Sequence, residues 1–148
     1  MSVLRWEGTV EIETAQERVW AGLIDPIILA RCSGAEGSAR EIGPYRWEVP
    51  ARITIGMFKL PVTLEIAMHD LVPPTDGRMT ITGTGPGAGL EGRSTVRLTS
   101  IGPDRTRLEW KAESTVAGPI AKFGAGLIEP VIQRQTEGFW EEFARAVR

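Results

Sequence analysis

The stretch RMTITGTGPGAGLEGRSTVRLTS, residues 78–100, decides how this chain folds. Within it, GAGLEG at residues 87–92 spells G-x-G-x-x-G, a phosphate-binding fingerprint that requires a strand before the loop and a helix after it. Apolar and polar residues alternate on both sides, at Met79 and Ile81 before the glycines and again over residues 93–100. One strand therefore precedes the glycine-rich loop, and another strand follows it. We interpret the glycines as a hairpin or a strongly bent strand pair that does not bind a nucleotide.

The residues at the N-terminus predict a strand followed by two short helices. Residues 3–13 alternate between apolar and charged side chains, which is typical of an amphipathic strand. Thr14-Ala-Gln-Glu17 has the form of a capping box and predicts the start of a first helix. Asp25-Pro26 interrupts this helix, because the residue before a proline avoids helical geometry, and a second short helix is expected to run to Ser33-Gly34.

The rest of the chain predicts about six strands and one long helix. Turn residues divide the chain from about residue 37 into short alternating segments. From Gly118-Pro119 the spacing becomes helical, which predicts a helix of roughly 28 residues with a kink at Pro130. We therefore expect one α+β domain over residues 1–148, in which a curved antiparallel sheet of about seven strands packs around the C-terminal helix.

Composition excludes several classes of function. The chain has 148 residues, a net charge of -2 and scattered basic residues, so no electrostatic footprint for nucleic acid is present. A single cysteine, Cys32, and a single histidine indicate neither a disulfide nor a zinc site, and we expect no metal and no cofactor. The chain begins with a strand pattern and has no apolar run of membrane-spanning length, which predicts a cytoplasmic protein.

The face of the sheet that turns toward the helix is predicted to be apolar. The alternation directs inward Tyr45, Trp47, Val49, Ala51, Ile53, Ile55, Leu60, Val62, Leu64, Ile66, Met68, Met79, Ile81, Val96, Leu98, Leu108, Trp110, Ala112 and Val116. In this register no carboxylate, imidazole or lysine in mid-strand faces the space beneath the helix. A curved sheet of this kind suits a pocket for apolar ligands, although large side chains of this kind are first of all core residues. The candidate ligand-binding residues are Trp20, Tyr45, Trp47, Ile53, Leu64, Met68, Trp110, Phe123, Leu127 and Val131.

An enzyme on this fold would need a proton carrier at the strand ends. His69 shares its strand face with polar residues and is expected to face solvent. Asp70 has the inward parity and lies at the end of its strand, which makes it a candidate carboxylate on position alone. Tyr45 is the third candidate, so an enzymatic function remains an alternative to a binding function.

Four other features have two interpretations each. Cys32 is expected to be a small buried apolar residue rather than a reactive thiol. The hydroxyls of Thr106 and Ser114 can orient a ligand or can form ordinary capping and core hydrogen bonds. Met57-Phe58 lies at an expected hairpin tip, which is either tucked under the helix or exposed as a lip for a membrane or a ligand.

Three blocks of the sequence resemble the CoxG family of carbon monoxide dehydrogenase proteins, within the START/Bet v 1-type helix-grip superfamily. The first block comprises Gly8, Val10, Glu17, Val19-Trp20, Leu23, Asp25-Pro26, Leu29-Ala30, Cys32 and Gly34, and it follows E-x-V-W-x-x-L-x-D-P-x-x-L-A-x-C-x-P-G. The second block is the glycine-rich segment from Gly83 to Gly92. The third is Val116-x-Gly118-x-Ile120-Ala121-x-x-Gly124-x-x-Leu127-Ile128. Two departures are a shortened Ser33-Gly34 after Cys32 and an end at Arg148, where some members have an apolar membrane tail.

The resemblance implies a helix-grip fold and a non-catalytic accessory protein. Members of this family are associated with molybdenum hydroxylases of the carbon monoxide dehydrogenase type, and the superfamily typically holds an apolar molecule between sheet and helix. We therefore expect a lipid or a quinone as ligand and molybdenum hydroxylase subunits as partners. Peripheral contact with the inner face of the membrane is the alternative to a purely cytoplasmic location. Alternatives are a polyketide cyclase/dehydratase-like enzyme and a pure protein-interaction module whose cavity is filled by its own side chains.

Overall fold

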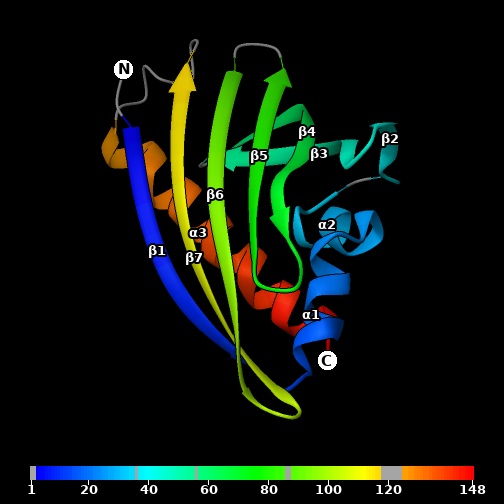
Figure 1. Cartoon of the computed structure of the whole chain (residues 1–148). Helices are drawn as coiled ribbons and strands as arrows, with labels where there is room; N and C mark the ends of the chain where they lie inside the picture. Colours follow the sequence, from blue (N-terminus) through cyan, green and yellow to red (C-terminus); the bar gives the residue numbers. More distant parts are fainter. Residues whose placement is uncertain (1–2, 36, 56, 86–87, 118–124) are drawn as a thin grey trace.

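Seven strands form one antiparallel sheet that bends around the C-terminal helix (Figure 1). The computed structural model describes residues 3–35, 37–55, 57–85, 88–117 and 125–148. The strands are β1 (Val3–Ile12), β2 (Arg40–Gly43), β3 (Arg46–Ile55), β4 (Phe58–Val72), β5 (Asp76–Gly85), β6 (Ala88–Gly102) and β7 (Arg105–Ala117). Their order is β1-β7-β6-β5-β4-β3-β2, and all neighbours are antiparallel. The predicted sheet and the predicted number of strands are confirmed.

Two short helices follow β1, as predicted, but the first does not begin with a capping box. Helix α1 (Gln16–Leu23) has Ala15 as its N-cap and no side-chain cap. Thr14 is instead buried in the core, where its carbonyl accepts a hydrogen bond of 2.7 Å from Thr106 Oγ1. Helix α2 (Pro26–Cys32) is capped by the Asp25 carboxylate, which accepts from the Ile27 amide at 2.9 Å. Proline at the first helical position suits this start.

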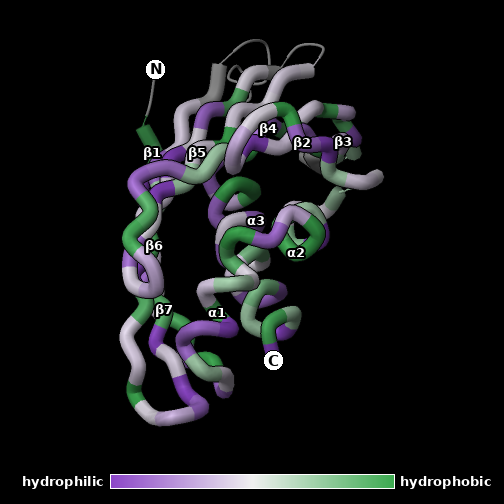
Figure 2. The backbone as a smooth tube through the Cα atoms, turned by 45° about the vertical axis from the view of Figure 1, so that its right-hand side comes forward, coloured by the Kyte–Doolittle hydropathy of each residue, from purple (hydrophilic) through white to green (hydrophobic). Residues whose placement is uncertain are grey.

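The long helix α3 (Ala125–Ala146) lies against the concave face of the sheet, and Figure 2 shows the sheet arching over it. Its 22 described residues include Pro130, which is exposed. The first part of the predicted helix, residues 119–124, lies outside the described residues, and the kink at Pro130 stays a prediction. Helix α3 contacts α2, β1 and β3, so it closes one side of the space that the sheet encloses.

The glycine-rich segment is a hairpin between two strands, as the alternation predicted. Strands β5 and β6 pair from Asp76↔Arg97 to Gly85↔Ala88, and no helix follows the glycines. A Cβ atom at Gly85 would lie 2.4 Å from the Pro61 carbonyl oxygen of β4. The absence of a side chain at this position therefore allows neighbouring strands to approach closely where the sheet bends.

The predicted inner face is apolar and buried, with one correction. Trp47, Val49, Ile66, Leu98 and Leu108 represent it; each is at most 6% exposed and belongs to the core cluster. Tyr45 was predicted to face inward and is instead 47% exposed. It occupies the turn between β2 and β3 with φ of 55°, so the alternation of the strand does not extend to it. The side chains of Ile53, Ile55 and Val116 lie outside the described residues.

Candidate functional site

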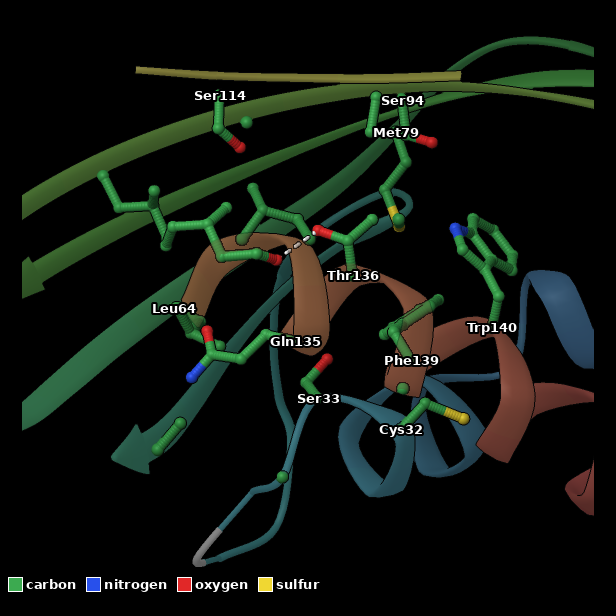
Figure 3. Close-up of a pocket in the computed structure, with 18 of the residues that line it drawn as sticks. Cys32, Ser33, Leu64, Met79, Ser94, Ser114, Gln135, Thr136, Phe139 and Trp140 are labelled. Carbon is green, nitrogen blue, oxygen red and sulfur yellow. Dashed lines mark hydrogen bonds between the residues drawn. The ribbon is translucent and has the colours of Figure 1, made fainter. Parts of the chain in front are cut away.

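A cavity of about 360 Å³ lies between the inner face of the sheet and helix α3 (Figure 3). Strands, α2 and α3 all contribute to it. Its lining comprises Cys32, Ser33, Gly34, Ala51, Arg52, Val62, Leu64, Met79, Ile81, Leu90, Gly92, Arg93, Ser94, Ala112, Glu113, Ser114, Ile132, Gln135, Thr136, Gly138, Phe139 and Trp140. Most of these side chains are apolar, and the volume lies within the usual range for small-molecule sites.

The cavity exists because small residues line one part of the space and aromatic residues fill another. Sheet positions such as Ala112, Gly92 and Ser94 contribute little volume. Near the C-terminal end of α3, Trp140 stacks on Trp110 with ring centroids 6.3 Å apart. Phe139 and Phe143 meet Trp140 edge-on at 4.8 and 5.7 Å. This aromatic cluster is closely packed, and its members Phe139 and Trp140 form the end wall of the cavity.

The polar side chains that line the cavity differ in whether they have hydrogen-bond partners. Ser33 Oγ donates to the Leu29 carbonyl at 2.7 Å, and Thr136 Oγ1 donates to the Ile132 carbonyl at 2.9 Å, so both are satisfied within their helices. Ser94 Oγ is buried and has no partner. The Ser114 side chain is also buried and turns from β7 toward α3 (Figure 3).

Charge is directed away from the cavity. Arg52, Arg93 and Glu113 border it, but each is exposed and follows or precedes a buried inward residue, so its charged side chain belongs to the outer face of the sheet. Cys32 is the one titratable group buried at the wall among the described residues. Burial raises the pKa of its thiol to about 12, with a smaller contribution from the negative charge of Glu142. The thiol is therefore neutral at physiological pH, and none of the described lining residues offers a buried charge.

The predicted ligand-binding residues divide into three groups. Leu64 lines the cavity. Trp20, Trp47, Met68, Trp110 and Val131 are buried in the surrounding core and are not part of the lining, whereas Tyr45 is exposed in a turn. Phe123 and the side chains of Ile53 and Leu127 lie outside the described residues. The cavity thus lies between sheet and helix, and Leu64 is the one described member of the predicted set that lines it.

Ser94 and Trp140 are two of the lining residues that were not predicted, although the sequence pattern indicates their inward direction. Ser94 lies two positions before Val96, so the alternation of β6 directs both to the inner face. Trp140 is 2% exposed and lies four positions after Thr136, on the helical stripe that ends at Phe143.

The three candidate proton carriers lie on the surface, outside the cavity. A ring nitrogen of His69 is 2.9 Å from Thr80 Oγ1 on the exposed face, as the polar parity predicted. Asp70 was given the inward parity, which is wrong, because the register shifts between His69 and Val72 and Asp70 has φ of 48°. Its exposed carboxylate is 3.7 Å from the Arg78 guanidinium.

Thr106 and the hairpin tip at Met57 each had two interpretations from the sequence. Thr106 is fully buried and serves a structural role through its bond to Thr14. Met57 is 97% exposed, which favours the lip interpretation of the β3–β4 hairpin tip; the side chain of Phe58 is not described.

Within the described ranges, no group of three or more His, Cys, Asp or Glu residues is placed to hold a metal ion. No helix in the described part of the chain is both long and apolar enough to cross a membrane.

A seven-stranded antiparallel sheet around a C-terminal helix, with an apolar cavity between them, defines a helix-grip protein of the START/Bet v 1-like class. A START superfamily protein from Mycobacterium smegmatis superposes with a TM-score of 0.71 at 14% identity, over 97% of each chain. The family model for CoxG, a subunit of carbon monoxide dehydrogenase, matches residues 8–148, and the chain belongs to this family.

Two further solved structures are similar to this chain. A conserved protein from Geobacillus kaustophilus has a TM-score of 0.86 at 25% identity, over 97% of this chain and 95% of that one. The ZhuI aromatase/cyclase from Streptomyces sp. R1128 has a TM-score of 0.70 at 18% identity, over 99% and 94%. The second likeness concerns the fold alone. No curated protein matches the chain.

Proposed function

We propose that this protein is a non-catalytic accessory protein that carries an apolar ligand, such as a lipid or a quinone, between its sheet and α3. The observation that carries the proposal is the cavity itself, which is lined mainly by apolar side chains and has no buried charge among the described residues. The family and the START-like fold support a ligand-binding accessory role. Assistance to a molybdenum hydroxylase is the second part of the proposal, and it rests on the family.

The size of the cavity limits what it holds. A volume of about 360 Å³ lies near the lower end of the range for ligand pockets, so a ring system or a chain segment fits better than a whole diacyl lipid. Burying ~200 Å² of apolar ligand surface at ~25 cal/mol/Å² contributes roughly 5 kcal/mol before ordering costs. This contribution alone corresponds to a dissociation constant of about 0.2 mM. Even this affinity requires a cavity that is already formed in the free protein, because ordering costs must stay low.

The observations favour a carrier over the two alternatives. An acid or base catalyst must come within hydrogen-bond reach of its substrate, whereas Tyr45, His69 and Asp70 all lie outside the cavity. The likeness to the aromatase/cyclase adds no catalytic group, because at 18% identity it concerns the fold. An interaction module with a filled interior does not account for the open space beside Ala112 and Gly138.

Filling the cavity from the sheet side tests the proposal. Ala112 is buried and lines the cavity, so Ala112→Leu introduces a larger apolar side chain into the space. We expect this variant to weaken binding of the uncharged fluorophore N-phenyl-1-naphthylamine by about tenfold or more, measured by fluorescence titration. Lys111→Leu is the matched control, because it adds the same side chain on the exposed face of the same strand.

Thermal unfolding of both variants establishes that they are folded before binding is compared. Unchanged binding by a folded Ala112→Leu protein would place the fluorophore elsewhere and overturn the assignment of the cavity. Equal weakening by Lys111→Leu would have the same consequence.

A further inference from the structure

We propose that the hydroxyls of Ser94 and Ser114, on the sheet side of the cavity, select a ligand with an uncharged oxygen, a carbonyl or a hydroxyl, on an otherwise apolar body. This inference rests on the proposed function, because it names the class of ligand that the same cavity takes. It assigns a binding role to two side chains of the sheet that the apolar lining alone does not explain.

The first observation is the unpaired hydroxyl of Ser94. The residue is 9% exposed, it lines the cavity, and its Oγ is buried with no hydrogen-bond partner. A buried hydroxyl without a partner destabilises the protein, and such groups in native structures are uncommon enough to require an explanation. A rotation about χ1 to another staggered rotamer is available to a serine, so the oxygen can turn toward a ligand in the space that its residue lines.

The second observation is the position of Ser114 on the neighbouring strand. Strands β6 and β7 pair with Ser94 opposite Ala112 and Gly92 opposite Ser114, so the two serines are diagonal neighbours on the inner face. A Cβ atom at Gly92 would lie 3.5 Å from Ser114 Oγ, so the glycine leaves the space beside this hydroxyl open. Both serines therefore lie on the part of the sheet formed by β6 and β7 that faces α3, with Ser94 nearer to Trp140 (Figure 3).

The remaining wall explains why the oxygen should be uncharged. The hydroxyls of Ser33 and Thr136 already donate to carbonyls in their own segments, and Gln135, an exposed position of α3, contributes an uncharged carboxamide. The side chains of Arg93 and Glu113 are exposed, and the Cys32 thiol is neutral. A charged group on the ligand would lose its water without gaining an opposite charge, which is strongly unfavourable. A neutral carbonyl or hydroxyl requires one or two hydrogen bonds, and the two serines can supply them.

A pair of probes with the same carbon skeleton tests this inference. 1-Tetralone is a bicyclic ketone, and tetralin is the same bicycle without the oxygen. Binding of each to the whole protein is followed by NMR titration, for the unchanged chain and for Ser94→Ala and Ser114→Ala. Thr95→Val is the matched control, because it removes an exposed hydroxyl from the opposite face of β6 without changing the shape of the side chain.

We expect 1-tetralone to bind more tightly than tetralin. Ser94→Ala should weaken binding of the ketone by about 2- to 12-fold, as expected for one hydrogen bond, and leave tetralin binding unchanged. Ser114→Ala should act in the same direction, and Thr95→Val should change neither. In the free protein, Ser94→Ala should raise the midpoint of thermal unfolding by about 2–4 °C, because it removes a buried group without a partner.

Three results would overturn the inference, and the third is distinguishable from the first two. Equal binding of both probes, or a ketone preference that survives in Ser94→Ala and Ser114→Ala, would remove the polar anchor and leave the carrier proposal standing. Binding of neither probe would overturn the carrier proposal together with the anchor.

Discussion

At the scale of the residue, the neutral thiol of Cys32 gives the stability of the protein a dependence on alkaline pH. The pKa of this thiol is about 12 in the folded protein because burial disfavours the thiolate, whereas its ordinary value is 9.0. Above pH 9 the unfolded chain therefore releases a proton that the folded chain keeps. The stabilisation is fully present below pH 9 and is lost as the pH rises toward 12.

Urea unfolding at a series of pH values checks this prediction. We expect the free energy of unfolding to fall more steeply between pH 9 and 11 in the unchanged protein than in Cys32→Ala, since the variant lacks the thiol. The comparison between the two proteins removes the contribution of other groups that titrate in this range. Parallel pH profiles would show that the thiol is as accessible in the folded chain as in the unfolded one.

Single residues also show what could and could not be predicted from the sequence. The apolar nature of Cys32 and the outward direction of His69 followed from residue type and strand parity, and both are confirmed. Asp70 and Tyr45 were placed on the wrong face because a register shift and a left-handed turn interrupt the alternation. Thr14 was predicted to cap a helix, but its position is set by a bond to Thr106, a residue 92 positions away. No local pattern contains such a contact.

At the scale of the element, Gly138 in α3 affects both the stability of the helix and the size of the cavity. It lies inside a 22-residue helix and lines the cavity, and a Cβ atom there would have no neighbour within 4 Å. Glycine inside a helix is less favourable than alanine by about 0.5–1 kcal/mol. Gly138→Ala should therefore raise the free energy of unfolding by about that amount, measured by urea denaturation.

A larger side chain at Gly138 should affect binding as well. Gly138→Leu is expected to weaken binding of tetralin by narrowing the cavity, whereas Glu141→Leu adds the same side chain at an exposed helix position outside the lining. A loss of stability in Gly138→Ala would show that the position needs glycine for its backbone. If tetralin bound equally well to the two leucine variants, Gly138 would not border the space that tetralin occupies.

Elements were predicted well where periodicity is strong. The strands on both sides of the glycine-rich segment, and the helix that begins at Asp25-Pro26, follow from alternation and from the chemistry of proline, and the structure contains them. The glycines between them were predicted to form a hairpin or a strongly bent strand pair, but the pattern did not show that Gly83 and Gly85 lie against Leu64 and Pro61 of β4. Pairing partners depend on how the sheet bends, which no single segment determines.

At the scale of the whole molecule, the order of elements predicted the architecture, but the cavity required the structure. Alternation predicted an apolar concave face beneath a helix, and that face is present. Whether space remains between the two depends on how small residues such as Ala112 and Gly92 face the bulky Phe139 and Trp140. That small difference between enclosed volume and side-chain volume cannot be obtained from a pattern of apolar and polar residues.

The central claim is that this cavity holds an apolar molecule, and the most direct test is to identify what the protein contains when purified. The protein would be purified without detergent and extracted with organic solvent, and the extract analysed by mass spectrometry alongside Ala112→Leu prepared in the same way. We expect a defined lipid or quinone with a neutral oxygen, in near-stoichiometric amount in the unchanged protein and much reduced in the variant. A ligand-free extract, combined with no uptake of added lipid or quinone, would contradict the claim and favour a protein-interaction module.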